Sequence, residues 1–400
     1  MRRTVLNAAL ARSTRARRDP EAALEVWRER AAAVRAAADI GDALAPDDQA
    51  FTDDLGFLLQ CFARVPDLTP LGWTVQLRSA EQRLANRLRI KSIHTQNPHV
   101  GAEPIERPVF IVGLPRTGTT VVHRVLAGAE PHRAPLLWEL QRTGLDQDDA
   151  SAARARRAVE RDAKALTRLA PDYAAMHPLR ADRPEESIAL MWRTYFPLSC
   201  APLPDWRAWI DQADLTADYE YLKQALQVLQ YGRTRRRWIL KFPGHVAHLD
   251  VIRQVFPDAR FVWTHRDPVA AAASFCSLVE TLNGVHCKRT DPAAIGRTWL
   301  GILAESIARG RKLRRALPDD TVVDVSSHRL ASDPHRFAPQ LLERVGAPWT
   351  HRDRDGLNAI AGPPGRTPAR TYALERFGLS ADAVEEAFGD YRERVADLKR

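Results

Sequence analysis

The sequence contains no long apolar run. None of its hydrophobic stretches approaches the roughly 20 residues that a membrane-spanning helix needs. Cysteine is also rare, and the four that occur (Cys61, Cys200, Cys276 and Cys287) do not have the spacing of metal ligands. The first 20 residues are basic but lack the apolar stretch of a signal peptide, and they favour an amphipathic helix over a transit peptide. We therefore expect no integral membrane segment, no metal site, and reduced thiols of the kind found in a cytoplasm.

Lysine is scarce. Only seven of the 59 basic residues are lysine, so arginine carries nearly all of the positive charge behind the formal net charge of +9. Arginine and alanine are both abundant, which is typical of a GC-rich genome and weakens the argument from basicity to nucleic acid. Aromatic residues are not interleaved with the arginine clusters, and we expect no nucleic-acid partner. Lys241, one of the few lysines, lies at the end of a β-like run, where it indicates a need for a compact point charge.

Short apolar runs alternate with long helical patterns through most of the chain. The runs predict strands at 109–113, 238–242, 260–264 and 321–325. The segments between them predict helices at 148–170, 185–196, 216–231, 246–255, 269–283 and 292–316. This alternation predicts an α/β fold, with a P-loop-like parallel sheet flanked by helices. The earlier part of the chain has only helical patterns, so we expect a helical N-terminal extension over 1–100 and an α/β domain over 101–400.

The segment PVFIVGLPRTGTTVVHRVL has the pattern of a strand, a turn and a helix. Gly113 and Gly118 are five residues apart, as are the two glycines in the phosphate loop of nucleotide triphosphatases. That loop requires lysine at the next position, where this chain has Thr119. Thr120 fills the following Ser/Thr position, and Arg116 supplies a guanidinium inside the loop. The motif predicts a cradle for a phosphate or sulfate-like group that is poorly equipped for ATP with magnesium.

A second motif, FVWTHRDPVAAAAS, begins with the strand expected at 260–264. Asp267 is a good helix N-cap, and Pro268 suits the first helical position. Arg266 therefore lies at the start of a helix, and Ser274 follows eight residues later on that helix. Arginine and a hydroxyl together can hold a phosphate monoester. Taken alone, the motif fits an ion pair between Arg266 and a carboxylate equally well.

Together, the two motifs resemble the 5′-phosphosulfate loop and the 3′-phosphate motif of sulfotransferases that use 3′-phosphoadenosine 5′-phosphosulfate (PAPS). Other segments match as well, among them APLLWEL, MHPLRADRPEES and WILKFPGHVAHLDVIRQVFPDARFVWTHRDP. The resemblance is to the bacterial branch of the family and covers residues 85–400. It implies a P-loop-like fold, no metal, and transfer of a sulfuryl group from PAPS to a hydroxyl or amine of a small-molecule or lipid acceptor.

The resemblance also implies which residues hold the donor. The 5′-phosphosulfate would be held by Arg116, Thr117, Gly118, Thr119 and Thr120. The 3′-phosphate would be held by Arg266 and Ser274, with a basic loop closing over it at Arg366 and Arg370. The family usually has lysine and histidine in that loop, and this chain does not.

The catalytic residues follow from the same resemblance. Arg116 and Lys241 would neutralise the charge that develops on the bridging oxygen as the sulfuryl group departs. His245 is the first candidate for the general base, because it follows Lys241 by four residues and can titrate near neutral pH. Many sulfotransferases have their catalytic histidine two residues after the lysine, where this chain has Pro243. Glu139, in LLWEL, is the second candidate.

Two other functions stay open at this point. The chain could be a nucleotide kinase or NTPase on a similar fold, although the missing lysine and the absence of an obvious strand-terminal Asp for magnesium count against that. It could also be a non-catalytic nucleotide-binding protein. His177 and Glu185 are candidates to line an acceptor pocket. The sequence fixes neither the acceptor nor the oligomeric state.

Overall fold

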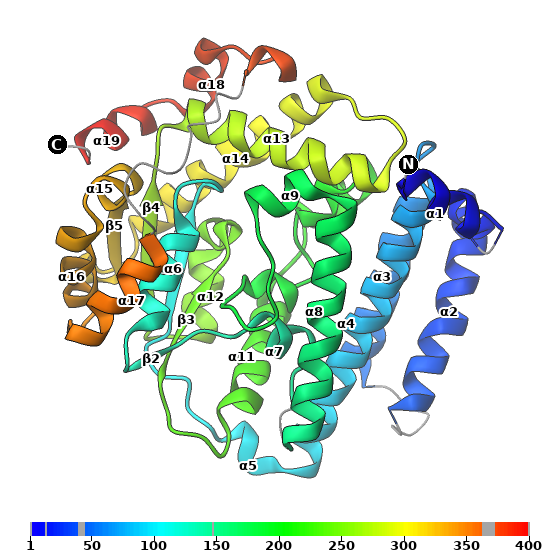
Figure 1. Ribbon diagram of the computed structural model, residues 1–400, viewed down its shortest axis with the longest axis horizontal. Coiled ribbons are helices and arrows are strands. Elements are labelled where there is room, and N and C mark those ends of the chain that lie inside the picture. Colours follow the sequence, from blue (N-terminus) through cyan, green and yellow to red (C-terminus); the bar gives the residue numbers. More distant parts are fainter. Residues whose placement is uncertain (1, 13, 39–44, 146–147, 362–372, 399–400) are drawn as a thin grey trace.

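Five parallel strands form one sheet in the order β2-β3-β1-β4-β5 (Figure 1). The computed structural model describes residues 2–12, 14–38, 45–145, 148–361 and 373–398. The strands are β1 (Val109–Gly113), β2 (His132–Arg133), β3 (Arg237–Lys241), β4 (Arg260–His265) and β5 (Val322–Ser326). Because the central strand β1 is covered on both faces, it is apolar and buried at every position. The expected α/β fold is confirmed.

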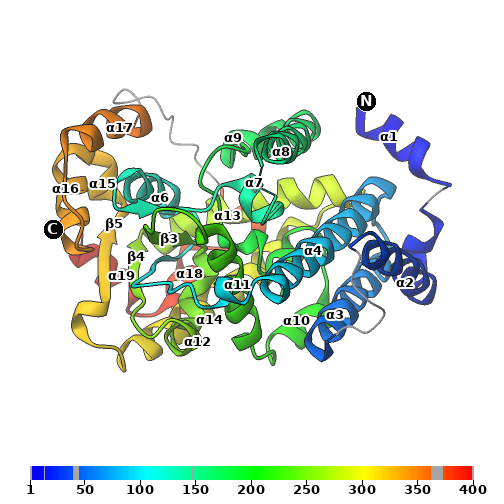
Figure 2. The same cartoon turned by 90° about the horizontal axis from the view of Figure 1, so that it is seen from below.

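Alternate residues of the strands pack into two different clusters. Ile111 and Ile239 face a layer that includes α6, whereas Phe110 and Leu240 face the opposite layer. Figure 2 shows α6, α15, α16 and α17 on one side of the sheet and α12 and α14 on the other. The helices after β1 are α6 (Thr119–Gly128), α7 (Leu137–Gln141), α8 (Asp149–Leu169), α9 (Pro171–Met176), α10 (Pro204–Ile210), α11 (Thr216–Gln230), α12 (Leu249–Val255), α13 (Pro268–His286), α14 (Pro292–Arg314), α15 (Ser327–Ser332), α16 (Pro334–Arg344), α17 (His351–Ala361), α18 (Ala381–Phe388) and α19 (Tyr391–Asp397).

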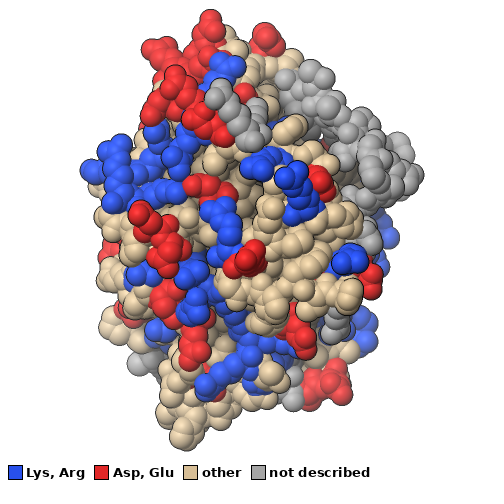
Figure 3. Space-filling model, turned by 90° about the vertical axis from the view of Figure 1, so that its left-hand side faces the viewer, with Lys and Arg blue, Asp and Glu red and all other residues tan. Residues whose placement is uncertain are grey.

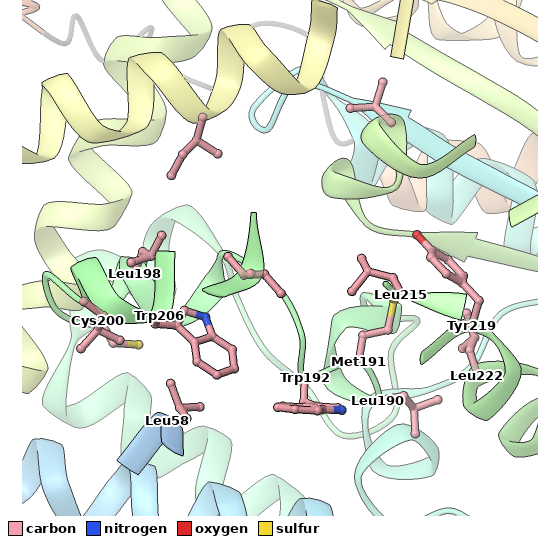
Figure 4. Packing of buried hydrophobic residues seen from close by; sticks show 14 of the residues in the cluster. Leu58, Leu190, Met191, Trp192, Leu198, Cys200, Trp206, Leu215, Tyr219 and Leu222 are labelled. Atoms are coloured by element: carbon pink, nitrogen blue, oxygen red, sulfur yellow. The ribbon is translucent and has the colours of Figure 1, made fainter. Parts of the chain in front are cut away.

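The chain before β1 is helical where it is described. Its helices are α1 (Arg2–Leu10), α2 (Pro20–Ala37), α3 (Pro46–Ala63), α4 (Pro70–Gln96) and α5 (Pro98–Gly101). Asp19 caps α2 by accepting from two backbone N–H groups, and Thr69 caps α4. One hydrophobic cluster joins this region to the sheet layer, and Figure 4 shows Leu58 of α3 in the same cluster as Tyr219 of α11. Because the hydrophobic core is continuous across residue 100, the structure does not test the domain boundary expected there. That boundary stays a prediction.

The strand predictions at 109–113, 238–242, 260–264 and 321–325 are each right to within one residue. The helix predicted at 185–196 is wrong. That segment contains only a short 3-10 turn, η2 (Ser187–Ala189), because Pro184 bridges to Leu136 and the backbone enters the turn extended at Glu186. Its apolar residues reflect a loop buried against the core rather than one face of a helix. The two-residue strand β2 was not predicted, since it is too short to give a pattern.

Candidate functional site

The loop between β1 and α6 has backbone angles that suit an anion-binding turn. Gly113 has φ +130°, and a Cβ added there would lie 2.5 Å from the carbonyl oxygen of Thr264, so only glycine fits. Gly118, at φ 80°, precedes α6, and Arg116 is left-handed at φ 67°. Gly118, the N-cap residue, has no side chain to cap α6, so the Thr119 and Thr120 N–H groups can face an anion, whereas the Val121 N–H already donates to the Gly118 carbonyl at 3.0 Å.

The loop threonines differ in what they can offer. The Thr117 side chain is fully buried, and its hydroxyl lies 2.7 Å from the Leu114 carbonyl oxygen and 2.6 Å from the Thr264 hydroxyl. The Thr117 hydroxyl therefore connects the loop to β4 by a hydrogen bond. Only the backbone of Thr117 can contact a ligand. Thr119 is buried and Thr120 is half-buried, both in the first turn of α6.

The two anion motifs predicted from sequence meet at Arg116. Its Nε donates to the Ser274 hydroxyl at 3.1 Å, and its Nη1 donates to the Met176 carbonyl at 2.9 Å. Arg266, which is exposed, donates from Nη1 to the Arg116 carbonyl at 2.9 Å. Asp267 caps α13 by accepting from two backbone N–H groups, as expected. Arg116 thus lies beside Arg266 and Ser274, which follow it by 150 and 158 positions in the sequence, next to the N-terminus of α6.

The remaining donor-site predictions, Arg366 and Arg370, lie outside the described residues. Within the described part of the chain, no group of three or more His, Cys, Asp or Glu side chains is arranged to hold a metal ion. No described helix is both long and apolar enough to cross a membrane.

Lys241 belongs to a cluster of charged groups near the loop between β1 and α6. Its side chain is only 1% exposed, and its Nζ donates to Oε1 of Glu186 and lies 4.0 Å from Oε1 of Glu185. Glu185 Oε1 also lies 3.2 Å from Nε2 of His177, the residue after Met176. Burial tends to raise the pKa of Glu185, but the neighbouring His177 and Lys241 outweigh it and lower this pKa to about 2. The cluster thus combines a cation and two partly exposed carboxylates beside Arg116.

His245 lies near the same strand end but is fully buried in the 3-10 turn η4 (Pro243–His248). Its Nε2 is 2.7 Å from the Ser187 hydroxyl, and its Nδ1 is 2.8 Å from the Tyr219 hydroxyl. The ring also meets the Phe110 ring edge-on, with centroids 5.1 Å apart. Burial lowers the pKa of His245 well below its ordinary value, which keeps the imidazole neutral. Both ring nitrogens are already used by neighbours.

Glu139, the second base candidate, is also enclosed. Its carboxylate accepts from Arg133 Nη2 at 2.7 Å and from the Leu136 backbone N–H at 2.9 Å, and thereby caps α7. Arg233 approaches the same carboxylate at 3.5 Å. The catalytic roles of His245 and Glu139 stay predictions, but both side chains have structural partners that account for them.

Glu186 is the residue of the site that sequence reasoning missed. It lies in MHPLRADRPEES, from which only His177 and Glu185 were selected. One sequence signal could have drawn attention to it: Glu185 and Glu186 are adjacent acidic residues, and the scarce Lys241 at the end of β3 needs an acidic partner. Spacing could not reveal the contact, because 55 residues separate Glu186 from Lys241.

Comparison with known proteins agrees with this geometry. A profile described as the sulfotransferase family matches residues 108–351. The chain is 27% identical over 191 residues to the Omega-hydroxy-beta-dihydromenaquinone-9 sulfotransferase of Mycobacterium bovis and of Mycobacterium tuberculosis. This match covers 45% of the chain and 47% of these relatives, so it spans about half of their length.

Two solved structures extend the likeness over nearly the whole chain. Sulfotransferase STF1 from Mycobacterium tuberculosis superposes with a TM-score of 0.76 and 25% identity, covering 90% of this chain and 98% of that one. Sulfotransferase STF9 from Mycobacterium avium gives a TM-score of 0.79 and 25% identity, covering 92% and 96%. The bacterial sulfotransferase resemblance inferred from the two anion motifs is therefore confirmed, and the chain belongs to the sulfotransferase family.

Proposed function

We propose that this protein transfers a sulfuryl group from PAPS to a hydroxyl or an amine of a lipid or small-molecule acceptor. The observation that carries the proposal is the hydrogen-bonded convergence of Arg116, Ser274 and Arg266 at the open N-terminus of α6. Such a site suits one ligand that is anionic at both its 5′ and 3′ ends. A triphosphate with magnesium would instead need the lysine that Thr119 replaces.

The donor would be held at two points. The first-turn N–H groups of α6 and the Arg116 guanidinium suit the 5′-phosphosulfate. Arg266 is exposed and lies one hydrogen bond from the loop, so with the Ser274 hydroxyl it suits the 3′-phosphate. Arg366 and Arg370 remain candidates to cover that phosphate. No step needs a metal ion to be bound by the protein.

The chemistry would rest on Lys241 and its carboxylate partners. In an in-line transfer, the sulfur–oxygen bond to the donor phosphate breaks while a new bond forms to the acceptor oxygen. Arg116 and Lys241 can offset the charge on the departing phosphate oxygen. Glu186, partly exposed and hydrogen-bonded to Lys241, can take the acceptor proton, with Glu185 as a second candidate. We favour Glu186 over His245 because both His245 ring nitrogens are occupied in a sealed site.

The proposed class of acceptor comes from the name of a related protein. One curated relative is named as the sulfotransferase of an omega-hydroxy dihydromenaquinone, which supports a lipid hydroxyl as the acceptor. A cytoplasmic location fits the four cysteines, all buried and free.

Donor recognition can be tested with Arg266→Ala. We expect affinity for 3′-phosphoadenosine 5′-phosphate to fall about 10- to 100-fold, the value of charge-assisted hydrogen bonds, and affinity for adenosine 5′-phosphate to change little. Isothermal titration of both ligands measures the difference. Arg28→Ala, which removes an exposed arginine of α2, is the matched control. An equal loss for both ligands would contradict the 3′-phosphate assignment.

The competing functions predict other results. A kinase or NTPase would be stabilised against thermal unfolding more by ATP with magnesium than by 3′-phosphoadenosine 5′-phosphate. A non-catalytic binding protein would bind the bisphosphate but give no sulfated product with any of a broad panel of lipid and small alcohols.

A further inference from the structure

Exposed apolar side chains lie on two helices, α1 and α4, that are in contact with each other. Among the described residues, five large hydrophobic side chains are exposed, and three of them are Val5, Leu6 and Val75. Val5 is the most exposed of the five, at 65%. The helices α1 and α4 are in contact, and the Leu71 N–H donates to Oδ1 of Asn7 at 2.8 Å. Exposed apolar side chains on two adjoining helices indicate a binding partner more strongly than residues scattered singly over the surface do.

The orientation of α1 is fixed by polar contacts on its inner face. Arg3 donates from Nε to the Leu169 carbonyl at 2.6 Å and from Nη1 to the Gly284 carbonyl at 2.8 Å. Arg3 and Asn7 are one helical turn apart, and Val5 is two residues from each, so it lies on the opposite side of the helix. The exposed face of α1 therefore cannot be buried by a simple rotation of the helix without breaking these bonds.

The same region is strongly basic. The first 18 residues contain six arginines and no acidic residue. Arg12, Arg15 and Arg18 are exposed, as is Arg78, one turn after Val75 on α4. By contrast, the face formed by α15, α16 and α17, on the opposite side of the molecule, mixes positive and negative side chains (Figure 3). The exposed acidic residues Asp19 and Glu21 follow at the start of α2, so the arginines flank the apolar side chains on one side. Exposed apolar side chains flanked by arginine match the surface of an anionic bilayer, which offers both acyl chains and negative headgroups.

This surface is connected to the proposed active site through α9. Leu169, which binds Arg3, is connected through α9 to Met176, whose carbonyl binds Arg116. A small hydrophobic cluster that includes Leu71 and Tyr173 fills the space between α4, α9 and α13. Figure 1 shows α9 between α1, at the right-hand edge of the molecule, and α6, in its left half.

We propose that α1 and the exposed positions Val75 and Arg78 of α4 dock this protein on the surface of anionic lipid membranes. Val5, Leu6 and Val75 enter the headgroup–acyl boundary, and the surrounding arginines bind lipid phosphates. The attachment is peripheral and reversible, since each exposed basic residue contributes only modestly and few apolar side chains are exposed. For catalysis, the docking would bring the site to a membrane-resident lipid acceptor, a consequence that rests on the function proposed above.

Vesicle sedimentation of the full chain tests the docking without reference to activity. We expect binding to vesicles of phosphatidylcholine mixed with phosphatidylglycerol to be at least about tenfold tighter than to phosphatidylcholine alone, and to weaken at high salt. The double variant Val5→Asp/Leu6→Asp should lose this binding. Tyr231→Asp is the matched control, because Tyr231 is 40% exposed, like Leu6 at 38%, but follows α11 at the end of the molecule near α5.

Thermal unfolding and affinity for 3′-phosphoadenosine 5′-phosphate should stay unchanged in both variants, which separates docking from folding and donor binding. The proposal is overturned if the protein does not bind the mixed vesicles, if it binds both vesicle types equally, or if the double variant binds like the original. Absence of sulfotransfer with every acceptor would contradict the proposed function and leave the docking result standing.

Discussion

Lys241 and His245 are four residues apart at the end of the same strand, yet their surroundings are opposite. Lys241 shares its sheet face with Ile239 and α6, where it meets Glu185 and Glu186 at a partly open surface. The η4 turn carries His245 to the other face, between Phe110 and Tyr219, where no surface is exposed. Proximity in sequence therefore says little about access, because the direction of each side chain relative to the sheet decides it.

The largest effect on kcat should come from substitution of Lys241. We expect Lys241→Met to lower kcat about 1000-fold, because it removes a preorganised cation from the charge that develops in the transition state. Affinity for 3′-phosphoadenosine 5′-phosphate should change only a few-fold. Initial rates at saturating donor and acceptor, with titration of the bisphosphate, measure both.

Lys312→Met serves as the control for that substitution, since it removes an exposed lysine at the far end of α14. If Lys241→Met and Lys312→Met had similar rates, the positive charge at the end of β3 would have no part in catalysis.

Glu186→Gln should have the next largest effect. A general base contributes about 100- to 10,000-fold, so we expect kcat to fall by at least about 100-fold while the fold is kept. Glu185→Gln is the matched comparison, because Glu185 is the adjacent carboxylate and lies 4.0 Å from the Lys241 Nζ rather than within hydrogen-bonding distance of it. If Glu185→Gln were the more damaging substitution, the base would be assigned to Glu185 and the pairing of Lys241 with Glu186 would be structural.

Much of this site was predictable, and the reasons differ by residue. Arg116, Arg266 and Ser274 were found from sequence because each belongs to a local strand–turn–helix pattern, whose backbone geometry is encoded by neighbouring glycine, aspartate and proline. Their convergence follows from parallel strands that end at one edge of the sheet. The environments of His245, Glu139 and Glu186 were not predictable, since each depends on contacts between distant segments: Tyr219 with His245, Arg133 with Glu139, and Lys241 with Glu186.

The secondary structure also divides into elements that the local sequence predicts and elements that depend on distant contacts. Strands that are buried on both faces gave clear apolar runs and were located closely. The segment 185–196 is also apolar, and its predicted helix was wrong because the buried residues Met191 and Trp192 belong to a loop held by tertiary contacts. Short apolar runs report burial, and local pattern alone does not separate a buried loop from a helix.

Substitution of the buried His245 should lower the free energy of unfolding rather than kcat. His245→Leu leaves the hydroxyls of Ser187 and Tyr219 without their imidazole partner, which should cost about 2–4 kcal/mol of unfolding free energy. The kcat of the folded protein should stay within a few-fold of the original. Urea unfolding and active-fraction-corrected rates measure the two effects, with the exposed His335→Leu as control. A 100-fold loss of kcat at unchanged stability would instead make His245 the base.

The pH dependence of stability should separate the buried histidines on both faces of the sheet from the Glu185 carboxylate. Burial lowers the pKa of His245, of His123 to about 3 and of His248 to about 4, so the folded state disfavours their protonation. Their contribution is complete above the ordinary histidine value of 6.5 and declines as pH falls below it, by about 2 kcal/mol at about pH 5 for His123. Glu185, whose pKa is lowered to about 2 from 4.5, loses its contribution only below 4.5. Urea midpoints measured down a pH series should therefore fall first through the histidine range, and Glu185→Gln should leave that first fall intact. If stability were level from neutral pH down to 4.5, the buried histidines would not be held neutral by the fold.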